Sequence, residues 1–167
     1  CKSKNRINDQ LASIIAIINI ILFALSFSNY AFYEHEQYIT TGIHQRIGFY
    51  LHYISLLIIV FFGYKLYQIN KENPVFELFQ KKIIVWIAAF FIIYMASTEL
   101  MLHGLVLSNS PVTPQEVQSS EFYKNYQSNE LHYLKQQIAY DAIYQTRTQI
   151  IKTGYPILWG ILAFVFL

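Results

Sequence analysis

The chain has 167 residues, of which 54% are hydrophobic and only 13% are charged. Soluble domains carry about 25% charged residues, so this composition is typical of a protein whose solvent is a membrane. The formal net charge of +2 excludes the strongly basic surface expected of a nucleic-acid-binding protein. The single cysteine, Cys1, excludes an internal disulfide and a cysteine-based zinc finger. The expected partner is therefore the lipid bilayer, with no nucleic acid.

Three apolar segments, residues 11–33, 47–67 and 83–107, are each long enough to cross a bilayer, which takes about 20 helical residues. A fourth apolar segment begins near Thr153 and is too short, as far as Leu167, to cross. The sequence predicts an all-α, multi-pass transmembrane protein with three full spans and the start of a fourth. We expect it to be a fragment of a longer chain, whose remaining helices are partners of this one.

Three regions follow from this division of the chain. Residues 1–107 form the three-span membrane region, residues 108–152 form a polar segment, and residues 153–167 begin the fourth helix. Lysine and arginine favour the cytoplasmic side of a membrane. They gather before the first span and between the second and third, so the N-terminus is predicted to be cytoplasmic and the polar segment to face outward; these basic residues are Lys2, Lys4, Arg6, Lys65, Lys71, Lys81 and Lys82.

Two helices are expected in the polar segment and one before the third span. Thr113, Pro114 and Glu116 form a capping-box pattern that predicts a helix start. Helical spacing over residues 131–151 predicts a second helix with a broad tyrosine-rich face. That helix either lies on the membrane interface or packs as a linker on its own protein. A third helical run is expected over residues 75–82.

Glu99 and His103 lie inside the third span, four residues apart and therefore on one face of the helix. A carboxylate in hydrocarbon costs about 2.5–3.5 kcal/mol even on the most favourable scale. Glu99 consequently needs a partner or a wet cavity, and the spacing predicts that it pairs with His103. His52, in the second span, is expected at a similar depth near the outer surface.

Further titratable groups are expected near the same surface. Glu34 and Glu36 follow the first span directly. With Glu99, His103 and His52 they form the candidate polar site, which has the chemistry to bind a metal, shuttle protons or hold a polar headgroup. The alternative is that these groups only make hydrogen bonds between helices, which is the favoured interpretation for the remaining histidines, His35, His44 and His132. No residue is assigned a catalytic role, and no metal or cofactor is identified.

Two motifs resemble a known family. The third span ends in YMASTEL at residues 94–100, and the fourth segment opens with GYPILWG at residues 154–160. This arrangement resembles the C-terminal part of the bacterial predicted membrane proteins called domain of unknown function 2339. The resemblance implies a polytopic inner-membrane protein with more helices and no established activity, in which Glu99 and Trp159 match family positions. The serine usual before the tryptophan helix is absent, and Thr153 or the pair Tyr155 and Pro156 stands there instead.

Three functions are compatible with these observations. An enzyme acting on a lipid-linked or envelope substrate at the outer interface would use Glu99 as general base or metal ligand, with His103 tuning it. A transporter or proton-coupled carrier would use the same pair as a titrating relay. A structural or assembly module would use it only for hydrogen bonds between helices. The first of these is the function that we expect.

Overall fold

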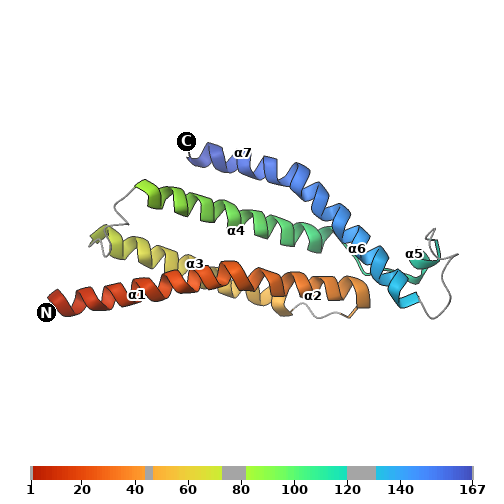
Figure 1. The fold of residues 1–167 in the computed structure, drawn as a ribbon, viewed down its shortest axis with the longest axis horizontal. Helices are drawn as coiled ribbons and strands as arrows, with labels where there is room; N and C mark the ends of the chain where they lie inside the picture. Colours follow the sequence, from red (N-terminus) through yellow and green to blue (C-terminus); the bar gives the residue numbers. More distant parts are fainter. Residues whose placement is uncertain (1, 44–46, 73–81, 120–130, 167) are drawn as a thin grey trace.

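The computed structural model describes residues 2–43, 47–72, 82–119 and 131–166, shown in Figure 1. The described residues are helical apart from short connections and contain no strand, so the predicted all-α fold is confirmed. The elements in chain order are α1 (Lys2–Leu22), the π-helix η1 (Phe23–Phe27), α2 (Ser28–Thr41), α3 (Ile47–Glu72), α4 (Lys82–Ser108), α5 (Pro114–Ser119), α6 (Leu131–Gln149), the π-helix η5 (Ile150–Gly154) and α7 (Tyr155–Phe166).

Four continuous helical stretches are long and apolar enough to cross a membrane. They are Ile7–Thr41, Ile47–Lys71, Val85–Ser108 and His132–Phe166. Successive stretches run in opposite directions along one long axis, which is horizontal in Figure 1. α5 lies beyond the end at which α2 and α4 finish. The prediction of a multi-pass membrane protein is confirmed, and the expected second and third spans coincide with α3 and α4.

The first span is longer than the sequence predicted. The helix continues through η1 and α2 to Thr41, so Glu34 and Glu36 lie on a helix and not in a connection. The hydroxyl of Thr41 donates a hydrogen bond to the Gln37 carbonyl, four residues back, at 2.7 Å, and no proline interrupts this run. The helix ends at Gly42, whose φ of 75° is the left-handed conformation that glycine adopts at helix ends.

The fourth span is also longer than predicted, and its helix does not begin at Thr153. α6, η5 and α7 form one continuous helical path from Leu131 to Phe166. Pro156 has no N–H to donate. The wider π-helical turn η5 ends two residues before it, and the Tyr155 N–H donates to the Ile150 carbonyl. The chain therefore passes a residue that commonly ends a helix, and the polar helix α6 adds its length to the apolar helix α7.

The predicted capping box is confirmed at the start of α5. The Thr113 N–H donates to Glu116 Oε2 at 2.6 Å, and the Glu116 N–H donates to Thr113 Oγ1 at 3.3 Å. Val117 of this short helix is buried. The helix predicted over residues 75–82 lies outside the described residues except for Lys82, with which α4 begins.

A hydrophobic core lies where α2, α4 and α6 meet. Ile39, Leu105 and Leu134, one from each helix, are almost fully buried. The other buried members of this core, called here the packed end, are Tyr38, Met101, Val112, Val117, Ala139 and Ile143. On α6, Leu134 faces the core while the predicted tyrosine face is exposed. One side of α6 thus packs on its own protein and the other is free to meet the membrane interface.

Outside the packed end, most of the buried positions described along the spans are occupied by small residues. Ser13, Ala16, Ala24, Ala31 and Ser97 are all buried, whereas most large apolar side chains along the spans are exposed. Helices in membranes associate through small residues that let their backbones approach, and their large apolar side chains face lipid. The pattern of burial therefore agrees with the membrane location that the composition indicates.

Candidate functional site

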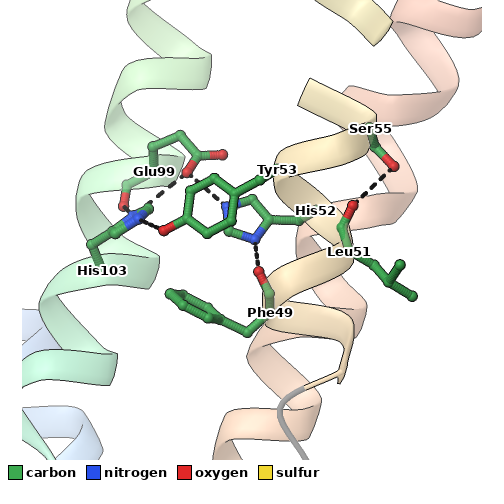
Figure 2. Close-up of polar contacts among 7 residues, drawn as sticks. All are labelled: Phe49, Leu51, His52, Tyr53, Ser55, Glu99 and His103. Atoms are coloured by element: carbon green, nitrogen blue, oxygen red, sulfur yellow. Dashed lines mark hydrogen bonds and ion pairs between the residues drawn. The ribbon is translucent and has the colours of Figure 1, made fainter. Parts of the chain in front are cut away.

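His52, Glu99 and His103 meet between α3 and α4 and are called here the His–Glu cluster (Figure 2). Glu99 Oε2 lies 3.2 Å from His52 Nε2 and 3.5 Å from His103 Nδ1. The predicted pairing of Glu99 with His103 is present, and His52 joins it from the neighbouring span. Two imidazoles thus converge on one carboxylate oxygen inside helices that cross the membrane.

The second nitrogen of His52 fixes the orientation of its ring. His52 Nδ1 hydrogen-bonds the backbone carbonyl of Phe49 (Figure 2), and a carbonyl only accepts, so Nδ1 carries a hydrogen. In a neutral ring, Nε2 therefore presents a lone pair to Glu99. The His52 side chain is only 3% exposed, and the Phe49 ring packs on it with centroids 5.2 Å apart.

His103 has partners on both ring nitrogens. Its Nδ1 lies 2.8 Å from the backbone carbonyl of Glu99, and its Nε2 lies 2.5 Å from the hydroxyl of Tyr53. Tyr53 follows His52 on α3, and the centroids of their rings are 4.0 Å apart. Figure 2 shows both α3 side chains reaching across to α4. The cluster is consequently tied to α3 at two adjacent residues.

A small cavity borders the cluster on the side of the first span. Its walls are Phe23, Ala24, His52, Met95, Thr98, Glu99 and Leu102. Phe23 and Ala24 belong to the π-helix η1, and the Ala24 carbonyl accepts a hydrogen bond from the Tyr94 hydroxyl at 3.3 Å. Single π-helical turns occur frequently at functional sites, and this one places a widened turn of helix beside Glu99.

The fourth span is attached to α4 close to the cluster. Trp159 Nε1–H donates to Ser97 Oγ at 2.9 Å, and the Ser97 hydroxyl donates to the Ile93 carbonyl at 2.7 Å. Ser97 is buried and stands two residues before Glu99. Trp159 therefore reaches α4 through Ser97, two residues from Glu99 in the chain.

Glu34 lies next to the cluster but not in it. Its Oε2 accepts a hydrogen bond from the Phe49 N–H at 3.0 Å. Phe49 is in the first turn of α3, where backbone N–H groups have no partner within the helix and a negative charge is favourable. Gly48 allows this approach, since a Cβ there would lie 2.8 Å from Glu34 Oε2. Glu34 therefore acts as a cap supplied by a different helix.

The remaining predicted polar residues lie elsewhere. Glu36 faces α6, where its carboxylate lies beside the Tyr140 hydroxyl. His35 is buried on α2, and its Nε2–H donates to the Leu105 carbonyl at 3.0 Å, in the last turn of α4. His132 is exposed on α6. His44 lies outside the described residues.

Three members of the site were not predicted as such from the sequence. They are the Tyr53 hydroxyl, the Phe49 carbonyl and the Ser97 hydroxyl. The only local signal for Tyr53 is its position beside His52. The contacts depend on how α3, α4 and α7 pack together, which residue spacing within one helix does not report.

The arrangement has two chemical capacities. The space between His52 Nε2 and Glu99 Oε2 suits a proton, because both atoms otherwise accept hydrogen bonds. The same three side chains offer two imidazole nitrogens and one carboxylate oxygen, all within 4.8 Å of one another, which is a group able to hold a metal ion. No protein-family model, curated protein or solved structure matches the chain.

Proposed function

We propose that the chain is a module of a bacterial polytopic inner-membrane enzyme that acts on a lipid-linked or envelope substrate at the outer interface. The reacting centre is the His–Glu cluster. The observation that supports this proposal is the Glu99 carboxylate, which lies between His52 and His103 in a membrane-spanning helix. The family resemblance of residues 94–100 and 154–160 supports the bacterial membrane.

The position of the cluster favours a substrate that arrives along the membrane. His52 stands five residues from the start of α3, or about 7.5 Å of helix at 1.5 Å per residue. This depth is close to the headgroup region of a bilayer. The side chains of Glu99 and His103 are 23% and 36% exposed, so a headgroup can reach them while its lipid tail stays in hydrocarbon.

The distribution of charge supports an outward orientation of this end. Lys65, Lys71 and Lys82 lie near the opposite end of the spans, at the end of α3 and the start of α4. Because basic residues favour the cytoplasmic side, this orientation places the N-terminus in the cytoplasm. The His–Glu cluster and α5 then face the outer side, where envelope substrates are assembled.

The cluster has the parts of an acid–base centre. Histidine is the side chain best suited to give and take a proton near neutral pH. The Phe49 carbonyl orients His52 and the Tyr53 hydroxyl orients His103, so both imidazoles are held in place before a substrate arrives. Glu99 Oε2 lies within 3.5 Å of a nitrogen of each imidazole, so the carboxylate can exchange a proton with either ring.

The test is a substitution in the full-length protein, made in the organism that carries the gene. Glu99→Gln keeps the size of the side chain and removes its charge, and Asp141→Asn makes the same change at an exposed position of α6. We expect Glu99→Gln to cause a lipid-linked precursor to accumulate, detected by liquid chromatography and mass spectrometry, and Asp141→Asn to leave the lipid profile unchanged. Unchanged lipids with a normal amount of Glu99→Gln protein would contradict the proposal and leave Glu99 a structural residue.

A further inference from the structure

We propose that the His–Glu cluster binds one divalent first-row transition metal ion, such as Zn²⁺, through His52 Nε2, Glu99 Oε2 and His103 Nδ1, with a fourth position open. This inference deepens the proposed function and rests on it for the role of the ion in catalysis. The binding itself is measurable without a substrate. Three protein ligands and one open position are typical of catalytic zinc, whereas structural zinc sites have four protein ligands.

The spacing of the ligand atoms fits a tetrahedral ion. Zinc binds imidazole nitrogen and carboxylate oxygen at about 2.0–2.2 Å, which puts two tetrahedral ligands about 3.4 Å apart. The two separations measured from Glu99 Oε2 are 3.2 Å to His52 and 3.5 Å to His103. The three atoms all lie within 4.8 Å of one another. Only a small closing movement of the two histidines is needed to surround an ion.

The hydrogen bonds around His52 leave a place for a cation. Its Nδ1–H is committed to the Phe49 carbonyl, so a neutral ring turns an Nε2 lone pair toward a carboxylate oxygen 3.2 Å away. Two acceptors facing each other repel unless a positive charge lies between them. Metal-binding histidines almost always donate their other N–H to a carbonyl, carboxylate or water, which is the arrangement that Phe49 provides.

His103 has an equivalent outer partner on the other side of the cluster. When Nδ1 binds a metal, the hydrogen moves to Nε2, which then donates to the Tyr53 hydroxyl 2.5 Å away. This change gives up the present hydrogen bond between Nδ1 and the Glu99 carbonyl at 2.8 Å. Tyr53 is able to accept or donate, so both tautomers of His103 have a partner.

The composition and surroundings of the cluster select the class of ion. Two imidazoles favour zinc and other transition metals, while magnesium and calcium prefer oxygen ligands alone. The small cavity bordered by Phe23, Ala24 and Thr98 reaches both His52 and Glu99. Its position beside two of the ligands provides space for a water or a substrate oxygen at the fourth position of the ion.

The test uses Co²⁺ as a spectroscopic substitute for zinc, added to the full chain in lipid nanodiscs after treatment with a chelator. We expect one Co²⁺ to bind per chain and to show the intense visible absorption of a four-coordinate ion. One equivalent of Zn²⁺ is expected to displace the Co²⁺ and abolish this absorption. We expect Glu99→Gln, His52→Ala and His103→Ala each to lose this absorption. His132→Ala, which removes an exposed histidine outside the cluster, is the matched control and is expected to bind as the parent does.

A second measurement covers the case in which the cluster variants do not fold. An ion that binds only the native state stabilises it, so Zn²⁺ is expected to raise the unfolding temperature of the parent and EDTA to reverse the rise, while Mg²⁺ has no effect. The proposal is overturned if the parent shows neither absorption nor stabilisation. It is equally overturned if well-folded cluster variants bind Co²⁺ as tightly as the parent.

The metal site and the enzyme proposal fail in distinguishable ways. One outcome is that a precursor accumulates in the Glu99→Gln strain while the parent protein binds no Co²⁺. This outcome overturns the proposed metal site and supports an acid–base centre without a metal. Bound Co²⁺ that depends on His52 and Glu99, together with unchanged lipids, supports the metal site and overturns the proposed substrate class.

Discussion

The two ends of the helical bundle are built differently. At the packed end, α2, α4 and α6 bury Ile39, Leu105 and Leu134, and polar side chains link the helices around the His–Glu cluster. At the other end, which includes the second half of α3, the first half of α4 and α7, large apolar side chains such as Val60, Trp86 and Phe164 are exposed. The first end is specified by contacts within the protein, and the second by contact with lipid.

This difference shows where substitutions are expected to matter. Moving an apolar side chain from lipid into a helix interface gains little, because lipid is as apolar as the interface. Close fit and polar partners therefore decide the stability of the packed end.

Leu105→Ala is expected to reduce the free energy of unfolding by about 2–5 kcal/mol, the usual cost of a cavity in a packed core. Leu105 is 1% exposed, whereas Leu57 is 70% exposed and faces outward from α3. Leu57→Ala is therefore expected to cost well under half as much. Unfolding of both variants in mixed detergent micelles measures the difference. Equal losses would show that the packed core and the exposed surface of α3 do not differ in packing.

Gly48→Ala is expected to cost about 1–3 kcal/mol, because overpacking forces neighbouring side chains to move. A Cβ at Gly48 would lie 2.6 Å from the Tyr30 ring and 2.8 Å from Glu34 Oε2, whereas nothing lies within 4 Å of a Cβ at Gly63. Gly63→Ala, on the same helix, is expected to be neutral or stabilising because alanine favours a helix. Thermal unfolding of the pair checks the prediction, and a stable Gly48→Ala protein would contradict the close approach of α2 and α3.

Tyr53→Phe is expected to weaken Co²⁺ binding by roughly 10-fold with little loss of stability, since an outer partner of a metal-bound histidine is worth about 10-fold to 100-fold in affinity. The Tyr53 hydroxyl hydrogen-bonds His103 Nε2. Tyr64→Phe removes a hydroxyl that contacts only Gln68 of its own helix in the described residues and serves as control. Titration of both variants with Co²⁺ measures the effect. Unaltered affinity would mean that Tyr53 does not orient a ligand.

Ser97→Ala is expected to cost about 0.6–1.7 kcal/mol, from the average to the largest value for hydrogen bonds between helices in membranes. It removes the acceptor of the Trp159 indole N–H. Ser55→Ala removes a hydroxyl that donates to the Leu51 carbonyl of its own helix and is expected to cost less. The free energies of unfolding of the two variants separate a link between helices from a local hydrogen bond. A cost no greater for Ser97→Ala than for Ser55→Ala would contradict the attachment of α7 to α4.

Much of the fold follows from the sequence because the length and hydropathy of a segment indicate a membrane span without reference to the rest of the chain. Length and hydropathy locate α3 and α4 to within a few residues, and the capping box at Thr113 locates α5. The errors arise where a helix continues through residues that commonly end one. The polar residues of α2 extend the first helix to Thr41, and the last helix continues past Pro156, which follows the π-helical turn η5.

The candidate site was predictable only in part, for a physical reason. Glu99 and His103 share a helix, so their pairing follows from helical geometry. His52 and Tyr53 come from another span and reach the same place only through the packing of α3 against its neighbours. Glu34 illustrates the reverse error, since a carboxylate that suggests chemistry in the sequence caps the first turn of α3 in the structure.

The measurement that tests the central claim most directly is X-ray absorption spectroscopy at the zinc edge, on the full chain loaded with Zn²⁺ in lipid nanodiscs. The account predicts two imidazole nitrogens and one carboxylate oxygen at about 2.0–2.2 Å, with one further light atom. It also predicts that His52→Ala loses the scattering of one imidazole while His132→Ala does not. A zinc ion surrounded only by oxygen, or one whose surroundings are the same in the parent and in His52→Ala, would contradict the assignment of the His–Glu cluster.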